Sequence, residues 1–259
     1  MKLTFEDKTS LVTGAAGAIG KGVARALLEA GAKVFITDLH QDAVQGVVAE
    51  LGRRCDGLAA DVAAEEQVRP VVERARVFLA GKIDVLVNCA GIIGQGRVEE
   101  LSVEDWDRMF AVNCRGTFLF CKHVVPTMKR CGYGKIVNFS SKSGKTGSAL
   151  LCHYSAAKAA VMGFTQALAF ELAQERITVN CVCPGITEGT GVWTQCSAEY
   201  IGNLGKTREE VVEQFTSKVP LGRLARVDDI VAMVLFLCSE KSDYMTGQSI
   251  NITGGREMH

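Results

Sequence analysis

The stretch TGAAGAIGKGVARALLEAG, residues 13–31, decides the fold of this chain. It continues the apolar run TSLVT (9–13), which predicts a strand, and its second half has the spacing of a helix. Gly14, Gly17 and Gly20 fall in the turn between them, where small residues let a pyrophosphate approach the backbone. Free N–H groups at the start of the helix favour its negative charge. Such a turn also occurs for packing alone, but its place after the first strand favours dinucleotide binding.

Strand-like and helix-like runs alternate along the rest of the chain. Six further runs predict strands, namely KVFIT (33–37), GLAAD (57–61), IDVLVN (83–88), KIVNFS (135–140), ITVNCV (177–182) and QSINIT (248–253). Helical patterns include residues 21–30, 65–79, 103–129, 156–174 and 228–238. Several strands are apolar nearly throughout, as strands covered on both faces are. The alternation predicts an α/β fold with a doubly wound, parallel, seven-stranded sheet.

A linker-like stretch is missing from the sequence, so we predict one domain over residues 1–259. The long span between the sixth and seventh strands differs from the rest, because it carries several glycines together with Trp193. Long segments of this kind often act as lids over a substrate. We expect a mobile substrate lid at about 186–220.

Composition excludes several classes of partner. Twenty-nine basic and 29 acidic side chains cancel, so we expect no general attraction to nucleic acid or to an anionic membrane. Apolar runs stay below the ~18 residues of a spanning helix. The polar start MKLTFEDKTS is unlike a secretory signal. These features predict a cytoplasmic protein with a small-molecule substrate.

Ten cysteines need an explanation, and seven of them lie within apolar segments. Cys181 and Cys183 are spaced to face the same side of a strand, and no CxxC pair occurs. Free buried cysteine behaves as a small hydrophobe, which favours a reducing compartment over disulfides or a metal. The four histidines lack the spacing of ligands, so we expect no metal site.

Asp38 ends the second strand, eighteen residues beyond Gly20. A carboxylate there accepts hydrogen bonds from both ribose hydroxyls of NAD and repels the extra phosphate of NADP. Residues 15–19 contain no Arg or Lys, so we expect NAD, with NADP less favoured. The alternative for Asp38 is the N-cap of the following helix. Asp61, after the third strand, is placed either to border the adenine or to cap a helix.

Tyr154 and Lys158 lie one helical turn apart, and Ser141 closes an apolar strand upstream. A strand end and a helix face can bring these groups together, which suits proton exchange with an alcohol while a hydride moves elsewhere. A free phenol titrates near ~10. An ammonium ~4 Å away at an effective dielectric of ~20 contributes about 4 kcal/mol, on the order of three pK units. We therefore predict a lowered pKa for Tyr154.

Several motifs together resemble the short-chain dehydrogenase/reductase family over the whole chain. They are TGAAGAIG (13–20), DV (61–62), NCAG (88–91), AVNCRGTF around Asn113, Ser141, YSAAK (154–158) and CPG (183–185). Two positions depart from the family pattern, with Ala18 in place of the middle glycine and Cys89 in place of an asparagine. Ala18 is small enough to keep the phosphate approach open, and Asn88 keeps its amide.

The resemblance implies a Rossmann-type fold and a set of site residues. Tyr154 is the implied general acid/base, Lys158 its activator and ribose ligand, Ser141 the holder of the substrate oxygen, and Asn113 part of a proton relay. The implied cofactor contacts are Gly14, Gly17, Ala18, Ile19, Gly20, Asp38, Asp61, Val62, Asn88, Tyr154, Lys158, Pro184, Gly185, Ile186 and Thr187. Thr190 comes later than the family's threonine does, so it receives no role. A homotetramer, with contacts through residues 103–129 and 156–174, is also implied.

Polar residues near the expected pocket favour a polyol, a sugar or a small hydroxyketone as substrate. They are Gln95, Arg97, Lys142, Ser143, Lys145, Trp193, Gln195 and Asn203. A 3-oxoacyl thioester reductase is the alternative enzyme. A dinucleotide-sensing regulator without turnover is the alternative from another class, but Tyr154, Lys158 and Ser141 are intact. A hydrolase triad is excluded, because Ser141 lacks a GxSxG elbow.

Overall fold

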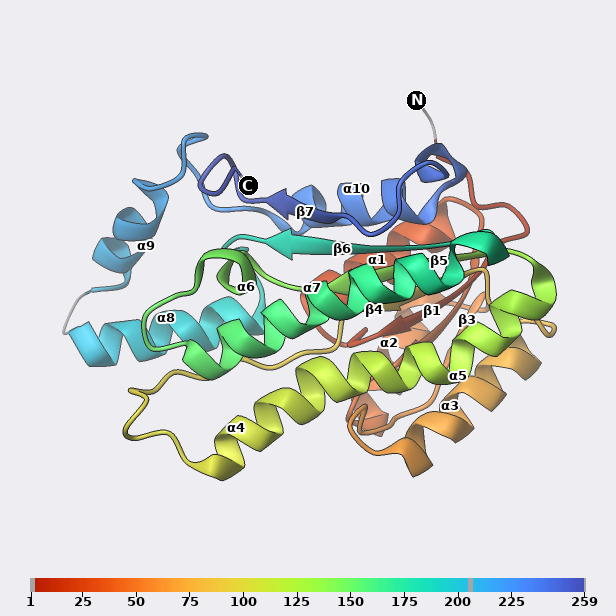
Figure 1. Ribbon diagram of the computed structural model, residues 1–259, viewed down its shortest axis with the longest axis horizontal. Coiled ribbons are helices and arrows are strands. Elements are labelled where there is room, and N and C mark those ends of the chain that lie inside the picture. Colours follow the sequence, from red (N-terminus) through yellow and green to blue (C-terminus); the bar gives the residue numbers. More distant parts are fainter. Residues whose placement is uncertain (1–2, 205–206, 259) are drawn as a thin grey trace.

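The computed structural model describes residues 3–204 and 207–258, which form a parallel seven-stranded sheet in the order β3-β2-β1-β4-β5-β6-β7 (Figure 1). The strands are β1 (Thr9–Thr13), β2 (Lys33–Thr37), β3 (Cys55–Gly57), β4 (Val85–Asn88), β5 (Gly134–Phe139), β6 (Ile177–Pro184) and β7 (Ser249–Ile252). Strand order reverses between β1 and β4. Open α/β sheets bind ligands at the carboxyl ends of strands at such a reversal. The predicted doubly wound fold is confirmed.

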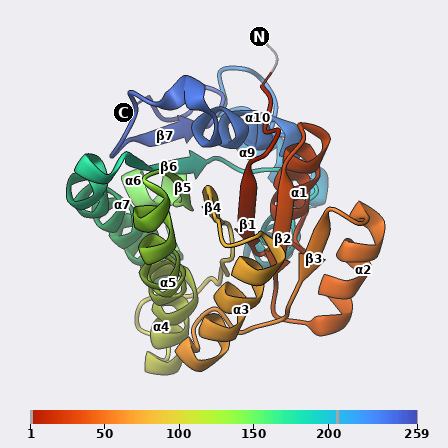
Figure 2. The ribbon, with the colours of Figure 1, turned by 90° about the vertical axis from the view of Figure 1, so that its right-hand side faces the viewer.

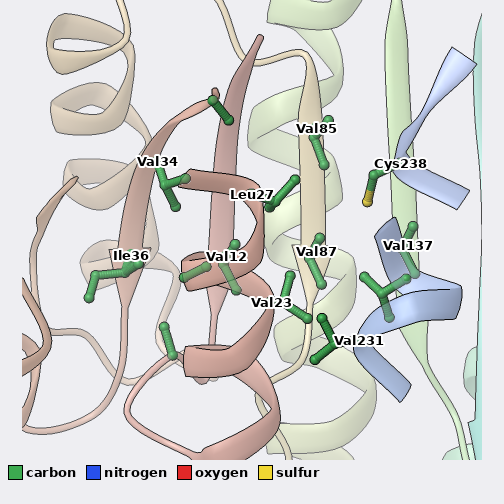
Figure 3. Packing of buried hydrophobic residues seen from close by; sticks show 14 of the residues in the cluster. Val12, Val23, Leu27, Val34, Ile36, Val85, Val87, Val137, Val231 and Cys238 are labelled. Carbon is green, nitrogen blue, oxygen red and sulfur yellow. The ribbon is translucent and has the colours of Figure 1, made fainter. Parts of the chain in front are cut away.

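Helices cover both faces of the sheet, because successive side chains of a strand alternate between its faces (Figure 2). One face carries α1 (Ala18–Glu29), α2 (Gln41–Leu51) and α10 (Val227–Cys238). The other carries α3 (Glu65–Phe78), α5 (Gly116–Cys131) and α7 (Cys152–Leu172). Figure 3 shows Val12 of β1 with Val23 and Leu27 of α1, whereas Leu11 packs in the opposite cluster. Burying one such side chain contributes about 1.5–3 kcal/mol.

The third strand lies earlier in the chain than residues 57–61, where the sequence predicts it. β3 pairs with β2 through Val34 and Cys55 at one end and Ile36 and Gly57 at the other. The polar Asp56 hides this short strand from a pattern of apolar residues. Beyond Gly57 the chain still runs beside the end of β2. Leu58 N–H donates to the Ile36 carbonyl at 3.2 Å, and Ala60 N–H donates to the Asp38 carbonyl at 2.9 Å.

Two predicted helices also differ in detail. Residues 103–129 form α4 (Val103–Phe110), a π-helical turn η1 (Ala111–Arg115) and then α5. The π turn was not predicted, because one inserted residue leaves the overall helical periodicity intact; such turns often mark functional sites. The helix predicted over 156–174 begins earlier, since α7 starts at Cys152 and therefore includes Tyr154 in its first turn.

The segment predicted as a lid contains α8 (Gly191–Leu204) and α9 (Arg208–Thr216). Its residues 205 and 206, and the side chain of Asn203, lie outside the described residues. Trp193 of α8 packs against Phe215 of α9, with ring centroids 6.0 Å apart. Thr207 and Glu210 form a capping box at the start of α9. The segment is thus helical rather than a structureless loop, and its motion stays a prediction.

All ten cysteines lie in the described part of the chain and are free thiols. Cys181 and Cys183 share one apolar cluster with Val161, as their spacing predicts. Among the described residues, we find no helix with the length and apolar character needed to cross a membrane.

Candidate active site

The glycine-rich turn joins β1 to α1 at the strand-order reversal. Gly14 has a φ of +66°, and a Cβ there would lie 2.7 Å from the backbone of Ala90. A Cβ on Gly20 would lie 2.2 Å from the Gly14 carbonyl oxygen. The N-cap of α1 is Gly17, and within the described residues no side chain caps it. The turn is therefore held tight by Gly14 and Gly20, and the N–H groups of Ala18 and its neighbours stay available to an anion.

Asp38 stands across this turn at the end of β2. Its Oδ2 accepts a hydrogen bond from Ala16 N–H at 2.9 Å, and its Oδ1 accepts one from Leu39 N–H at 2.7 Å. The N-cap of α2 is His40, so the alternative that Asp38 caps this helix is wrong. A carboxylate is thereby fixed beside the anion-binding turn, where a further phosphate group would meet its charge.

Asp61, Val62 and Asn88 lie around the same crevice with different contacts. Asp61 Oδ1 accepts from Ala63 N–H at 2.9 Å, in a turn that precedes α3 and its N-cap Ala64. Val62 is buried against Gly116, and a Cβ added to Gly116 would lie 2.8 Å from Val62 Cγ2. Asn88 Nδ2 donates to Asn138 Oδ1 at 2.9 Å, which joins β4 to β5. Asn88 Nδ2 therefore links two strands of the sheet, while its buried Oδ1 has no hydrogen-bond partner among the described residues.

Ser141, Tyr154, Lys158 and Asn113 line one cavity of about 600 Å³. Ser141 follows β5 and accepts a hydrogen bond from Ser143 N–H at 3.1 Å. The helix α7 presents the other two groups of the predicted triad from successive turns. Lys158 Nζ lies 5.8 Å from the centroid of the Tyr154 ring and donates to the Phe139 carbonyl at 2.9 Å. Both side chains are buried, so an ammonium and a phenol share a water-poor space.

Asn113 reaches this cavity from the π turn η1. Its Nδ2 donates to the Ile92 carbonyl at 3.0 Å, and its Oδ1 accepts from Ile92 N–H at 3.2 Å. Gly91 makes room, since a Cβ there would lie 2.6 Å from Asn113 Oδ1 and 3.2 Å from Lys158 Nζ. Gly91 belongs to the NCAG motif, but only Asn88 of that motif was given a role from the sequence. The need for a glycine at position 91 was therefore not predicted.

Burial, rather than the neighbouring ammonium, dominates the acidity of Tyr154 in this structure. Burial raises the pKa of Tyr154 to about 12, and the Ser141 hydroxyl opposes this shift. Burial likewise lowers the pKa of Lys158 to about 8. The predicted lowering of the Tyr154 pKa is therefore wrong, because burial disfavours the charged phenolate more than the Ser141 hydroxyl favours it.

The cavity collects one part of the predicted site and not the other. Its lining includes Ile19, Asn113, Ser141, Tyr154, Lys158, Pro184, Gly185, Ile186 and Thr187. The remaining predicted residues lie outside this lining, namely Gly14, Gly17, Ala18, Gly20, Asp38, Asp61, Val62 and Asn88. The site thus combines a tight turn beside β1 and β2 with a cavity beside β5 and α7, and Ile19 of α1 lines that cavity.

The other pocket candidates divide in the same way. Lys142, Ser143 and Trp193 line the cavity, and Gln95 donates to the carbonyl of a further lining residue, Cys196, at 3.2 Å. Gln195 donates to the Ile93 carbonyl at 3.2 Å, whereas Lys145 donates to the Ser249 carbonyl at 2.7 Å. Arg97 is outside the lining. Thr190 is buried in it, and its Oγ1 accepts from Trp193 N–H at 3.1 Å at the start of α8. Four further residues of the lining were not predicted from the sequence, namely Cys196, Lys218, Arg256 and Glu257.

Within residues 3–204 and 207–258, His, Cys, Asp and Glu side chains form no group of three that could hold a metal ion.

Comparison with known proteins assigns the family. Residues 14–257 match the family model described as "Enoyl-(Acyl carrier protein) reductase". An uncharacterized oxidoreductase of Thermotoga maritima is 40% identical, with 98% of each chain covered. A sorbitol dehydrogenase of Cereibacter sphaeroides is 34% identical, over 99% of this chain and 100% of the relative. A 3-oxoacyl-(acyl-carrier-protein) reductase of Aquifex aeolicus is 35% identical, over 98% and 99%.

A solved structure has the same fold. A variant of actinorhodin polyketide ketoreductase, crystallised with NADPH, superposes with a TM-score of 0.93 at 35% identity, over 97% of this chain and 98% of that one. The fold and the cavity define a dinucleotide-dependent oxidoreductase. The chain belongs to the short-chain dehydrogenase/reductase family, whose members act on CH–OH or ketone groups.

Proposed function

We propose that this protein interconverts a secondary alcohol and a ketone with NAD, and that its substrate is a polyol, a sugar or a small hydroxyketone. The observation that carries the proposal is the meeting of Ser141, Tyr154 and Lys158 in one cavity beside the glycine-rich turn. Similarity to a sorbitol dehydrogenase supports this substrate class.

Each side chain has a distinct role in the proposed reaction. Ser141 donates a hydrogen bond to the substrate oxygen, and Tyr154 takes the hydroxyl proton during oxidation or returns it during reduction. Lys158 stabilises the phenolate and binds the ribose. Asn113 positions a water molecule that passes the proton on. The dinucleotide supplies the acceptor for the hydride and, when oxidised, a positive charge beside the phenol.

The residues present fit such a dinucleotide. The uncapped start of α1 suits the pyrophosphate, and Gly91 leaves space in front of Asn113 and Lys158. Pro184, Gly185, Ile186 and Thr187 line the cavity where the nicotinamide carboxamide would be held. Asp61 and Val62 are the proposed neighbours of the adenine.

Asp38 supports NAD over NADP. Its carboxylate accepts a hydrogen bond from Ala16 in the turn, and two cations of α1, Lys21 and Arg25, pair with Glu50. The extra phosphate of NADP would be repelled by the Asp38 carboxylate. The NADPH bound by the polyketide ketoreductase keeps NADP as the competing hypothesis.

A 3-oxoacyl thioester reductase remains the second candidate, because the Aquifex aeolicus reductase is similar over nearly the whole chain. An NAD- and NADP-linked screen of polyols, sugars, hydroxyketones and acetoacetyl thioesters separates the two, with Tyr154→Phe as the blank. Turnover of the first three classes with NAD is the expected result. Turnover of thioesters alone would overturn the substrate assignment, and binding of NAD without any turnover would favour a regulator.

We also propose a homotetramer that packs through α5 and α7. Phe118 and Phe170 are 44% and 87% exposed on these helices, and burying them would remove apolar surface from water. Light scattering tests the mass, and a monomeric wild type would contradict the proposal. The free thiols support a cytoplasmic location.

A further inference from the structure

Three cationic side chains from separate segments meet on the wall of the cavity that contains Ser141. Lys142 follows Ser141 directly, Lys218 lies beyond α9, and Arg256 follows β7 near the C-terminus. Glu257 lines the same wall. The proposed proton and hydride transfers use none of these four side chains.

One carboxylate oxygen is shared by two of the cations. Glu257 Oε1 lies 3.8 Å from Lys142 Nζ and 3.3 Å from Arg256 Nε. The side chains of Lys142, Arg256 and Glu257 are only 13%, 18% and 9% exposed. Glu257 Oε2 is buried, and among the described residues it has no hydrogen-bond partner. Three cations therefore share this wall with one carboxylate, and a single oxygen of that carboxylate pairs with two of them.

The cluster is built into the fold rather than carried on a loose surface. Asn251 Nδ2 and Thr253 Oγ1 donate to the Glu257 carbonyl at 3.1 and 3.2 Å. The Arg256 guanidinium lies 5.8 Å from the ring centroid of Phe215 in α9. Lys142 Nζ donates to Ser148 Oγ at 2.8 Å. Burial, and then the charges of Arg256 and Lys218, hold the pKa of Lys142 below its usual value, while Glu257 opposes them.

We propose that Lys142, Lys218 and Arg256 bind an anionic group of the substrate, so that the alcohol or ketone carries a carboxylate or a phosphate. The Glu257 carboxylate occupies the position of that anion and competes with it. This inference rests on the proposed oxidoreductase function and adds the charge of its substrate. The dinucleotide phosphates do not account for the cluster, because their site is the start of α1 and not the segments after Ser141 and β7.

Matched ligands test the charge without requiring turnover. Calorimetry measures binding of gluconate, glucitol 6-phosphate and neutral glucitol to the NAD-loaded Tyr154→Phe protein at constant ionic strength. At least one anion should bind about tenfold or more tightly than glucitol, and the two anions separate carboxylate from phosphate recognition. Equal or weaker binding of both anions would overturn the inference.

Variants separate recognition from a structural role. Arg256→Gln should weaken the favoured anion about tenfold or more and leave glucitol within about twofold, since a desolvated charge contact is lost. Glu257→Gln should strengthen binding of the anion, which a purely structural carboxylate would not do. Arg53→Gln removes an exposed cation elsewhere and should change nothing. Equal losses for glucitol and the anion in Arg256→Gln would contradict the inference, whereas selective anion binding with no turnover in the wild type would refute only the proposed enzyme.

Discussion

The glycine-rich turn and the cavity around Tyr154 are built in different ways. The turn is made by neighbours in sequence, and backbone geometry at Gly14 and Gly20 determines its shape. The cavity is made by the ends of β5 and β6, by α7, by α8 and α9, and by the C-terminal residues. The shape of the turn is therefore a local property of the chain, whereas the groups proposed for the proton chemistry come together from distant segments and depend on burial.

The largest effect should come from the cavity. Tyr154→Phe removes the proposed acid/base and should lower kcat about a thousandfold, within the range for loss of a general acid/base. The affinity for NAD should stay within about twofold, because the turn is untouched. Steady-state kinetics and calorimetry measure the two quantities. Tyr244→Phe is the control, since Tyr244 is fully exposed, and residual turnover near wild type in Tyr154→Phe would refute the acid/base role.

A second prediction concerns the buried ammonium. The pKa of Lys158 is lowered to about 8 in the folded protein, from about 10.4 in an unfolded chain. Between these values the unfolded state binds more protons, so this group costs stability below pH 8, and the cost is relieved as the pH rises to about 10.4. Lys158→Met removes the cost, which is at most about 3 kcal/mol.

Denaturant unfolding of both proteins across this pH range measures the difference. The stability gained by Lys158→Met should be largest near neutral pH and should shrink toward pH 10. A gain that is independent of pH would show that the ammonium is not desolvated. Lys241→Met supplies a control at an exposed lysine.

The turn provides the third test. Gly20→Ala places a methyl group 2.2 Å from the Gly14 carbonyl oxygen and should cost about 1–3 kcal/mol, with a parallel loss of NAD affinity. Gly46→Ala in α2 meets nothing within 4 Å and should instead be neutral or stabilising by up to about 1 kcal/mol. Thermal unfolding and NAD titration measure both variants. If Gly20→Ala and Gly46→Ala were equally stable, the close approach of Gly20 to the Gly14 carbonyl oxygen would be contradicted.

The smallest effect concerns cofactor choice. Asp38→Asn keeps the size of the side chain but removes the charge that repels an extra phosphate. The ratio of kcat/KM for NAD to that for NADP should fall about tenfold, which corresponds to about 1.4 kcal/mol. Asp42→Asn, an exposed acid in the first turn of α2, should leave the ratio unchanged. A wild-type preference for NADP would refute the assignment before any variant is made.

The sequence predicted a parallel, doubly wound sheet of seven strands well, because buried parallel strands read as apolar runs. It misplaced the third strand, since β3 is only three residues long and includes Asp56. It found Asn113 but not the π turn that carries this residue, because helical periodicity continues on both sides of it.

Burial and distant contacts were the properties that local patterns did not reveal. The spacing of Tyr154 and Lys158 predicted their common helix face but not the desolvation that sets both pKa values. Arg256 and Glu257 received no role from the sequence, and the fold brings Glu257 to Lys142. Contacts between residues more than a hundred positions apart leave no signature in spacing.

The central claim is that Tyr154 becomes acidic enough for proton exchange only when a dinucleotide is bound beside Lys158. The direct measurement is the ultraviolet difference titration of wild type against Tyr154→Phe, with and without NAD. Burial raises the pKa of Tyr154 to about 12. We predict that this pKa falls toward neutrality when NAD is added, because the oxidised dinucleotide places a positive charge beside the phenol. An unchanged titration in the presence of saturating NAD would contradict the account.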